Sequence, residues 1–181
     1  MSRKSKTNPL VDKSQLDSPL ENETAFDSKD KLDTDVTTLP KVDKKAVDPF
    51  DGFVLVIEDG KALKLSPKTQ NHVFYQLAKK EEDNSLYIRM SGNEGGGLHS
   101  KEWVSLNSIL TLLDEMKDKP LKSTLLKPVF KGGSANNCGF MAAVLRCNEI
   151  GLLTQSEKSV FVHQLHTDYD NNKAKLLAMA N

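Results

Sequence analysis

The chain has 181 residues, with 25 lysines and arginines against 25 aspartates and glutamates. This length accommodates about one ordinary domain, and the zero net charge argues against a polyanion binder with a broad basic surface. No apolar run approaches the roughly 18 to 20 residues needed to cross a bilayer, and no apolar stretch of a secretory signal follows the polar start. We therefore expect a cytoplasmic, bacterial protein without a membrane partner.

The first 48 residues differ in composition from the rest of the chain. They contain 13 apolar residues, no glycine and a single aromatic residue, Phe26. Such a segment buries too little apolar surface to offset the entropy of ordering it, which predicts a disordered arm over residues 1–48. Apolar residues and glycines make up about half of residues 49–181, as in globular domains. These residues are expected to form a single α+β domain.

The first half of this domain, residues 49–118, is expected to be an antiparallel sheet of about four strands covered by a helix. β-Branched or alternating apolar residues predict strands at 53–57, 62–65, 72–78 and 86–90. The Asp59-Gly60 pair between the first two runs is a hairpin signal, because glycine adopts a positive φ at little cost. The predicted order is therefore ββββα.

The covering helix follows a glycine-rich segment. Residues 92–97 predict a flap or a long connection, and residues 102–106 either add a short strand or lead into the helix. Ser105 or Asn107 can cap a helix that ends near Lys117. Its apolar stripe consists of Leu106, Ile109, Leu110 and Leu113.

The second half, residues 125–181, is expected to be mainly helical, with two to three helices. Helices are predicted over 135–148 and 170–180, after an apolar connector or strand at 125–130. Residues 154–157 have the capping-box pattern, which favours a helix over 156–165, although the run 160–162 fits a strand equally well. A helix-turn-helix over 147–160 is a further alternative, disfavoured because Glu157 stands where an apolar residue is expected.

Cys138 is a candidate nucleophile in the first turn of a predicted helix. Unpaired amides there favour the thiolate, and papain-like thiol hydrolases use this arrangement. A histidine base, an orienting carboxylate and an oxyanion donor would come from His163, Asp168 or Asp170, and Asn136 or Asn137. Because 25 residues is a short path between Cys138 and His163, a structural cysteine is the favoured interpretation. Cys147 is expected to be a reduced thiol as well.

The histidines do not indicate a metal site. The spacing of His163, His166 and Asp170 would place three ligands on one face of a helix. Nothing nearby supplies a closed ligand set, so we expect no metal and no cofactor.

Lys127 and Lys131 flank a second polar segment, Gly132-Gly133-Ser134, at a predicted helix start. Two glycines followed by a hydroxyl can present several backbone N–H groups to an anion such as phosphate. The pattern lacks the Gly-Lys-Ser/Thr of a P-loop and the spaced glycines of a dinucleotide fold. It is interpreted as either a capped helix start or an anion site that includes Lys127, Lys131 and Ser134.

Four strands and one helix leave one sheet face open, which predicts a surface for single-stranded nucleic acid. Its candidate residues are Phe74, Tyr75, Tyr87, Arg89, Lys79 and Lys80, with Trp103 as a further stacking residue. The order ββββα is similar to that of single-strand-binding transcriptional coactivators. The alternative is that these aromatic side chains pack in the core.

The sequence thus favours a non-enzymatic binding or accessory role, with single-stranded nucleic acid as the expected partner. One alternative is a protein-interaction or regulatory module that uses the N-terminal arm. The other is a thiol hydrolase with Cys138 as nucleophile. The sequence predicts no oligomeric state.

Overall fold

The computed structural model describes residue 48 and residues 50–117 and 119–181, which belong to one compact unit. The predicted N-terminal arm lies outside the described residues, apart from Asp48. In chain order the elements are β1 (Phe53–Leu63), β2 (His72–Lys80), β3 (Leu86–Asn93), β4 (Val104–Ser105), α1 (Leu106–Asp114), β5 (Leu121–Lys122), the 3-10 helix η1 (Ser123–Val129), α2 (Asn137–Arg146), β6 (Leu153–Ser156), β7 (Ser159–Leu165) and α3 (Tyr169–Ala178).

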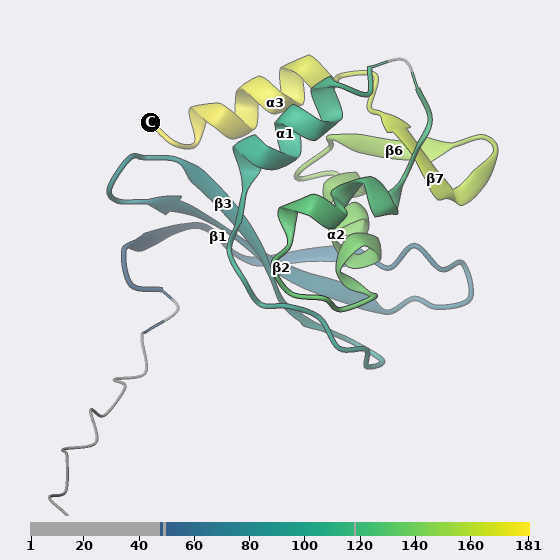
Figure 1. The fold of residues 1–181 in the computed structure, drawn as a ribbon, viewed down its shortest axis with the longest axis horizontal. Helices are drawn as coiled ribbons and strands as arrows, with labels where there is room; N and C mark the ends of the chain where they lie inside the picture. The colour runs from purple at the N-terminus through teal and green to yellow at the C-terminus, as the bar shows by residue number, and fades with distance from the viewer. Residues whose placement is uncertain (1–47, 49, 118) are drawn as a thin grey trace, which may run out of the picture. The chain divides into compact units, whose positions relative to one another are not determined.

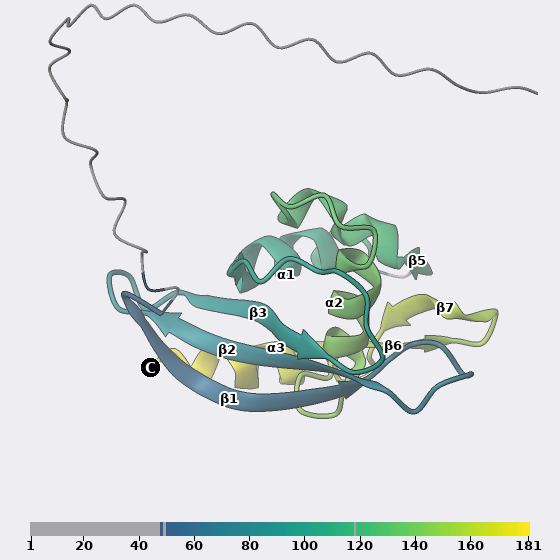
Figure 2. The ribbon, with the colours of Figure 1, turned by 90° about the horizontal axis from the view of Figure 1, so that it is seen from below.

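An antiparallel sheet in the order β1-β2-β3-β4 forms the first half of the domain. Helices α1 and α2 lie on the same side of this sheet (Figures 1 and 2). The Ser105 hydroxyl caps α1 by accepting a hydrogen bond from the Ser108 N–H at 3.4 Å. The predicted fold class, a four-stranded antiparallel sheet covered by a helix and followed by further helices, is confirmed.

The prediction of a hairpin at Asp59-Gly60 is wrong, because β1 runs through this pair without turning. The strand absorbs the extra residues as two irregularities in its pairing with β2, between Leu55 and Ile57 and between Ile57 and Gly60. Gly60 lies opposite Tyr75, and a Cβ atom at Gly60 would lie 2.4 Å from the tyrosine ring. The glycine therefore makes room for an aromatic ring and does not serve a turn.

The core lies between this sheet and the helices. Val73, Tyr75 and Leu77 point to the same face of β2 and are fully buried. The predicted stripe of α1 is buried in the same core, and α2 adds Met141 and Leu145. These side chains belong to one continuous apolar cluster, which fixes the sheet and both helices as a unit.

A second, three-stranded antiparallel sheet in the order β5-β7-β6 occupies part of the half that was expected to be mainly helical. Residues 156–165 therefore form strands, so the helical prediction and the helix-turn-helix alternative are both wrong there. Thr154, the first residue of the capping-box pattern, lies in β6 and begins no helix, and the Ser156 hydroxyl accepts a hydrogen bond from the Lys158 N–H at 3.4 Å within the hairpin turn. Arg146 of α2 holds the hairpin by donating to the Val160 carbonyl at 2.9 Å.

The C-terminal helix α3 is tied to α1 through one carboxylate. Asp114 accepts hydrogen bonds from the Tyr169 hydroxyl at 2.9 Å and from the Lys173 ammonium at 2.6 Å. Tyr169 is itself almost fully buried. None of the helices in the described part of the chain is long and apolar enough to cross a membrane.

Replacing Gly60 with alanine should destabilise the domain by about 2 kcal/mol, because the new methyl group would overlap the buried Tyr75 ring. Urea unfolding measures the change. Gly139→Ala is the matched control, since a Cβ there meets nothing within 4 Å and the residue lies in α2. The control should be neutral or stabilising by up to about 1 kcal/mol. Equal unfolding midpoints for Gly60→Ala and the wild type would contradict this account.

Candidate nucleic-acid interface

Tyr75, one of the predicted stacking residues, is fully buried. Its hydroxyl donates to a Glu149 carboxylate oxygen at 2.5 Å and contacts the Cys147 sulfur at 3.4 Å. Burial, followed by these two contacts, raises the pKa of Tyr75 above its usual value. The side chain is committed to the interior and is not available to a base.

Arg89 is only 8% exposed, although it lies on the sheet face opposite the core. Its guanidinium carbon lies 4.2 Å from the ring centre of Phe50 and 4.8 Å from that of Trp103. Its Nε atom donates to the Gln76 side chain at 2.8 Å. Arg89 therefore supports neighbouring rings through cation–π contacts and does not project towards solvent.

The rings around Arg89 form an aromatic cluster, which consists of Phe50, Phe53, Tyr87 and Trp103. Phe53 stacks on Trp103 with ring centres 4.8 Å apart and meets the edge of Tyr87 at 5.3 Å. All four side chains are half-buried. The cluster thus keeps partly accessible aromatic surface, and it includes the predicted stacking residues Tyr87 and Trp103.

The other predicted residues of the sheet have separate surroundings. Lys80 pairs with Glu82 in the turn after β2, where Glu81 and Asp83 are also exposed. Lys79 is half-buried. Phe74 lies beneath the Lys61 ammonium, 5.7 Å from the ring centre. Because acidic side chains surround the β2–β3 turn, this end of the sheet is not a strongly basic surface.

An internal carboxylate occupies what we call the anion cradle, the N–H groups of residues 131 and 132 in the segment predicted as a capped helix start or an anion site. Glu102 accepts hydrogen bonds from the Lys131 N–H at 3.0 Å and the Gly132 N–H at 2.9 Å. The Ser100 hydroxyl donates to the same carboxylate at 2.7 Å. Burial alone would raise the pKa of Glu102, yet these donors and the Lys131 charge lower it. The Ser134 hydroxyl is engaged elsewhere, with the Leu98 carbonyl at 2.6 Å.

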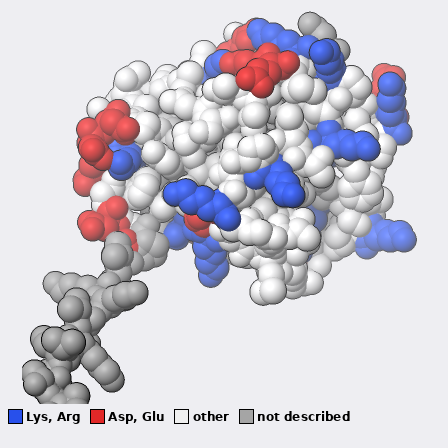
Figure 3. Space-filling model, in the orientation of Figure 1, with Lys and Arg blue, Asp and Glu red and all other residues white. Residues whose placement is uncertain are grey.

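Basic side chains are concentrated in one part of the chain despite the neutral total. Residues 119–148 contain five lysines and arginines and no aspartate or glutamate. In the orientation of Figure 1, Figure 3 shows lysines and arginines over the middle of the face that bears η1 and α2. Acidic side chains gather mainly at its left margin and upper edge.

What we call the lysine face consists of three exposed lysines, Lys127 and Lys131 from this stretch and Lys101 from the segment before α1. None of them forms an ion pair with another described residue. Glu102 connects the lysine face to the aromatic cluster, because its carboxylate holds Lys131 and its chain neighbours are Lys101 and Trp103. The sequence did not indicate this connection, because Lys101 and Glu102 lie outside the acid-free stretch of residues 119–148.

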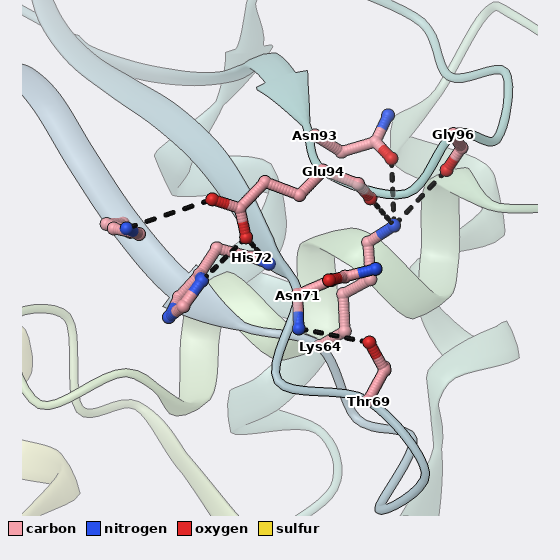
Figure 4. Close-up of polar contacts among 8 residues, drawn as sticks. Lys64, Thr69, Asn71, His72, Asn93, Glu94 and Gly96 are labelled. Atoms are coloured by element: carbon pink, nitrogen blue, oxygen red, sulfur yellow. Dashed lines mark hydrogen bonds and ion pairs between the residues drawn. The ribbon is translucent and has the colours of Figure 1, made fainter.

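The glycine-rich loop after β3 lies beside this region and is held by Lys64 (Figure 4). The Lys64 ammonium donates to the Asn93 side chain at 2.8 Å and to the carbonyls of Glu94 and Gly96 at 2.5 and 3.2 Å. The Glu94 carboxylate accepts from the His72 backbone and ring, both at 2.8 Å. The loop expected to be a flap or a connection is therefore fixed at its start by charged contacts.

The residues proposed for a thiol hydrolase have different partners. Burial raises the pKa of Cys138, against a smaller opposing effect of Lys127. His163 lies on β7, fully buried, and its Nε2 atom is 2.8 Å from the Ser123 hydroxyl. No hydrogen bond joins Cys138 to His163.

The remaining members of that predicted site have other contacts, which for Asp168 involve the backbone N–H and not the carboxylate. Asp170 pairs with Lys117 at 3.6 Å, and the Asp168 N–H donates to the His166 ring at 3.0 Å. Asn136 donates to the Leu98 carbonyl, and Asn137 accepts from the Ser100 N–H. Within the described ranges, no group of three or more potential ligands could hold a metal ion.

Comparison with known proteins gives no family for this chain. No protein-family model matches it, and neither a curated protein nor a solved structure matches it significantly.

Cys138 should react with iodoacetamide more slowly in the folded protein than in the urea-unfolded protein at pH 7.5, because burial raises its pKa. A Cys147→Ala background makes Cys138 the single thiol. His163→Asn should leave the rate unchanged in this background. Faster labelling in the folded state that depends on His163 would instead support a catalytic pair.

Acid should destabilise the domain through His163. Burial, with a smaller effect of Arg146, lowers the pKa of His163 from 6.5 to about 4. The unfolded chain therefore binds this proton more readily, so stability is lost as the pH falls below about 6.5. Between pH 7 and 5 the wild type should lose about 2 kcal/mol more than His163→Asn, as measured by urea unfolding. The same pH dependence in both proteins would rule out this assignment.

Proposed function

We propose that this domain is a non-enzymatic binding module for single-stranded nucleic acid. The lysine face contacts the phosphates, and the aromatic cluster provides a surface on which a base stacks. This placement differs from the open sheet surface expected from the sequence, because Tyr75 and Arg89 are engaged internally. Ser134 and the N–H groups of the anion cradle also have internal partners and are not used.

The observation that carries this proposal is the connection between the two surfaces. Lys101, Glu102 and Trp103 are consecutive, and the Glu102 carboxylate holds the backbone of Lys131 at 3.0 Å. Cations and an aromatic ring therefore meet within a short stretch of surface. Single-strand binders combine these two features, because ammonium groups follow the backbone while rings stack on bases of any sequence.

The charge pattern also sets the expected strength of binding. Three lysines without described ion-pair partners can contact about three phosphates, which gives a modest, salt-sensitive affinity. Neutral overall charge reduces long-range attraction of nucleic acid. A module of this kind suits an accessory protein that holds a strand weakly.

Binding of a fluorescein-labelled dT20 oligonucleotide at micromolar protein should raise its anisotropy at low salt. The logarithm of the association constant should fall with the logarithm of salt concentration with a slope of about −2, for three contacts at roughly 0.7 each. The chain has a single tryptophan, Trp103. Base stacking on the aromatic cluster should therefore quench the intrinsic tryptophan fluorescence during the same titration.

The double variant Lys127→Gln/Lys131→Gln should weaken binding and reduce the steepness of the slope by about 1.4. Lys158→Gln/Lys175→Gln removes the same charge from other elements and is the matched control, with binding close to that of the wild type. Absence of an anisotropy change at low salt would overturn the proposal. Equal losses in the two double variants would show that net charge, and not the lysine face, is responsible.

A further inference from the structure

Leu98 is the most exposed large apolar side chain in the described part of the protein, at 86% exposure. The other exposed large apolar side chains range from 37% to 54%. Single apolar residues on a surface are common and need no explanation by themselves. The setting of Leu98 is different, because the backbone beneath it is held in place by several contacts.

Two side chains from the segment just before α2 fix the backbone at Leu98. The Leu98 carbonyl accepts hydrogen bonds from the Ser134 hydroxyl at 2.6 Å and from the Asn136 amide at 2.9 Å. On one side, the Asn93 amide donates to the Gly97 carbonyl at 3.0 Å. On the other side, the Ser100 N–H donates to Asn137 at 2.9 Å.

The preceding glycines complete this arrangement. Gly95, Gly96 and Gly97 all have positive φ, of 68°, 78° and 104°. A Cβ atom at Gly97 would lie 3.1 Å from the Asn136 amide nitrogen and 3.3 Å from the Phe140 ring. With the Lys64 contacts of Figure 4, these features make a closely fitted loop whose apolar side chain nevertheless points into solvent.

Two members of the lysine face lie near Leu98 in the chain or near a residue that contacts it. Ser134, which holds its carbonyl, follows Lys131 by three residues, and Lys101 follows Leu98 by three residues. Leu98 is therefore near Lys101 in the sequence, and its hydrogen bond with Ser134 brings it near the segment that carries Lys131. A single nucleic-acid strand whose phosphates contact these lysines would also contact the leucine side chain.

We propose that Leu98 is an apolar wedge that inserts beside or between the bases of the bound single strand. This inference rests on the proposed function, and it identifies Leu98 as the residue that separates neighbouring bases of the bound strand. Leucine side chains can enter base steps and unstack them, at a cost that protein contacts offset. A fixed loop lowers the entropic cost of that insertion, because the side chain is already displayed in the free protein.

The same features favour a nucleic acid over a lipid surface. One leucine buries too little apolar area for stable membrane binding, since even a single acyl chain anchors a protein only marginally. A base step needs only one wedge. The aromatic cluster, joined to the lysine face through Glu102, adds a second contact suited to bases.

The experiment uses the full chain and a dT20 strand that carries two adjacent 2-aminopurines. Unstacking of this pair by Leu98 should increase 2-aminopurine fluorescence on binding. Leu98→Ser should abolish the increase and weaken binding roughly tenfold. The salt slope should stay unchanged, because the phosphate contacts remain. Ser134→Ala, which frees one of the two bonds to the Leu98 carbonyl, should weaken binding in the same direction but less.

Leu177→Ser is the matched control, because Leu177 is an exposed leucine on α3 and should be replaceable without effect. If the wild type binds dT20 and Leu98→Ser binds equally well with the same 2-aminopurine signal, the wedge is refuted while the proposed function stands. If the wild type does not bind dT20 at all, the proposed function itself fails. Co-sedimentation of the wild type with phosphatidylserine vesicles, lost in Leu98→Ser, would overturn the choice of nucleic acid as partner.

Discussion

The contact between the Glu102 carboxylate and the backbone of the 131–132 turn organises the surface of this domain. It joins two segments 29 to 30 residues apart, at distances of 3.0 and 2.9 Å. The carboxylate accepts from both N–H groups at once, and hydrogen bonds to a charged acceptor are stronger than those between neutral groups. Because Trp103 follows Glu102 directly, this contact also holds the aromatic cluster next to Lys131 of the lysine face.

Glu102 also shows which features the sequence alone could predict and which it could not. Two glycines and a hydroxyl predict backbone donors that an anion can reach, because that property is local. The anion that fills the cradle comes from a distant segment, and nothing in the local pattern identifies Glu102. Gly60 illustrates the same limit. Asp-Gly is a local turn signal, but the Tyr75 ring on the neighbouring strand determines why a glycine is needed there.

The helix predicted over residues 156–165 was wrong for a related reason, since these residues form strands. A hydroxyl followed three residues later by glutamate fits a helix cap, whereas Val160, Phe161 and Val162 favour a strand. The hydrogen bond from Arg146 to the Val160 carbonyl and the pairing of β7 with both β5 and β6 favour the strand. In contrast, the buried alternation of β2 and β3 and the stripe of α1 were predictable, because each depends only on residues within its own element.

The glycine-rich loop and the 131–132 turn are both ordered by charges that belong to the protein itself. The Lys64 ammonium lies among carbonyl oxygens, and the Glu102 carboxylate lies among N–H groups. The contact of Lys64 with the Glu94 carbonyl is partly buried, and dissolved salt screens such a direct contact far less than contacts between exposed charges. The glycine-rich loop should therefore keep its shape at ionic strengths that remove a bound polyanion, so that association and release need not involve refolding of the loop.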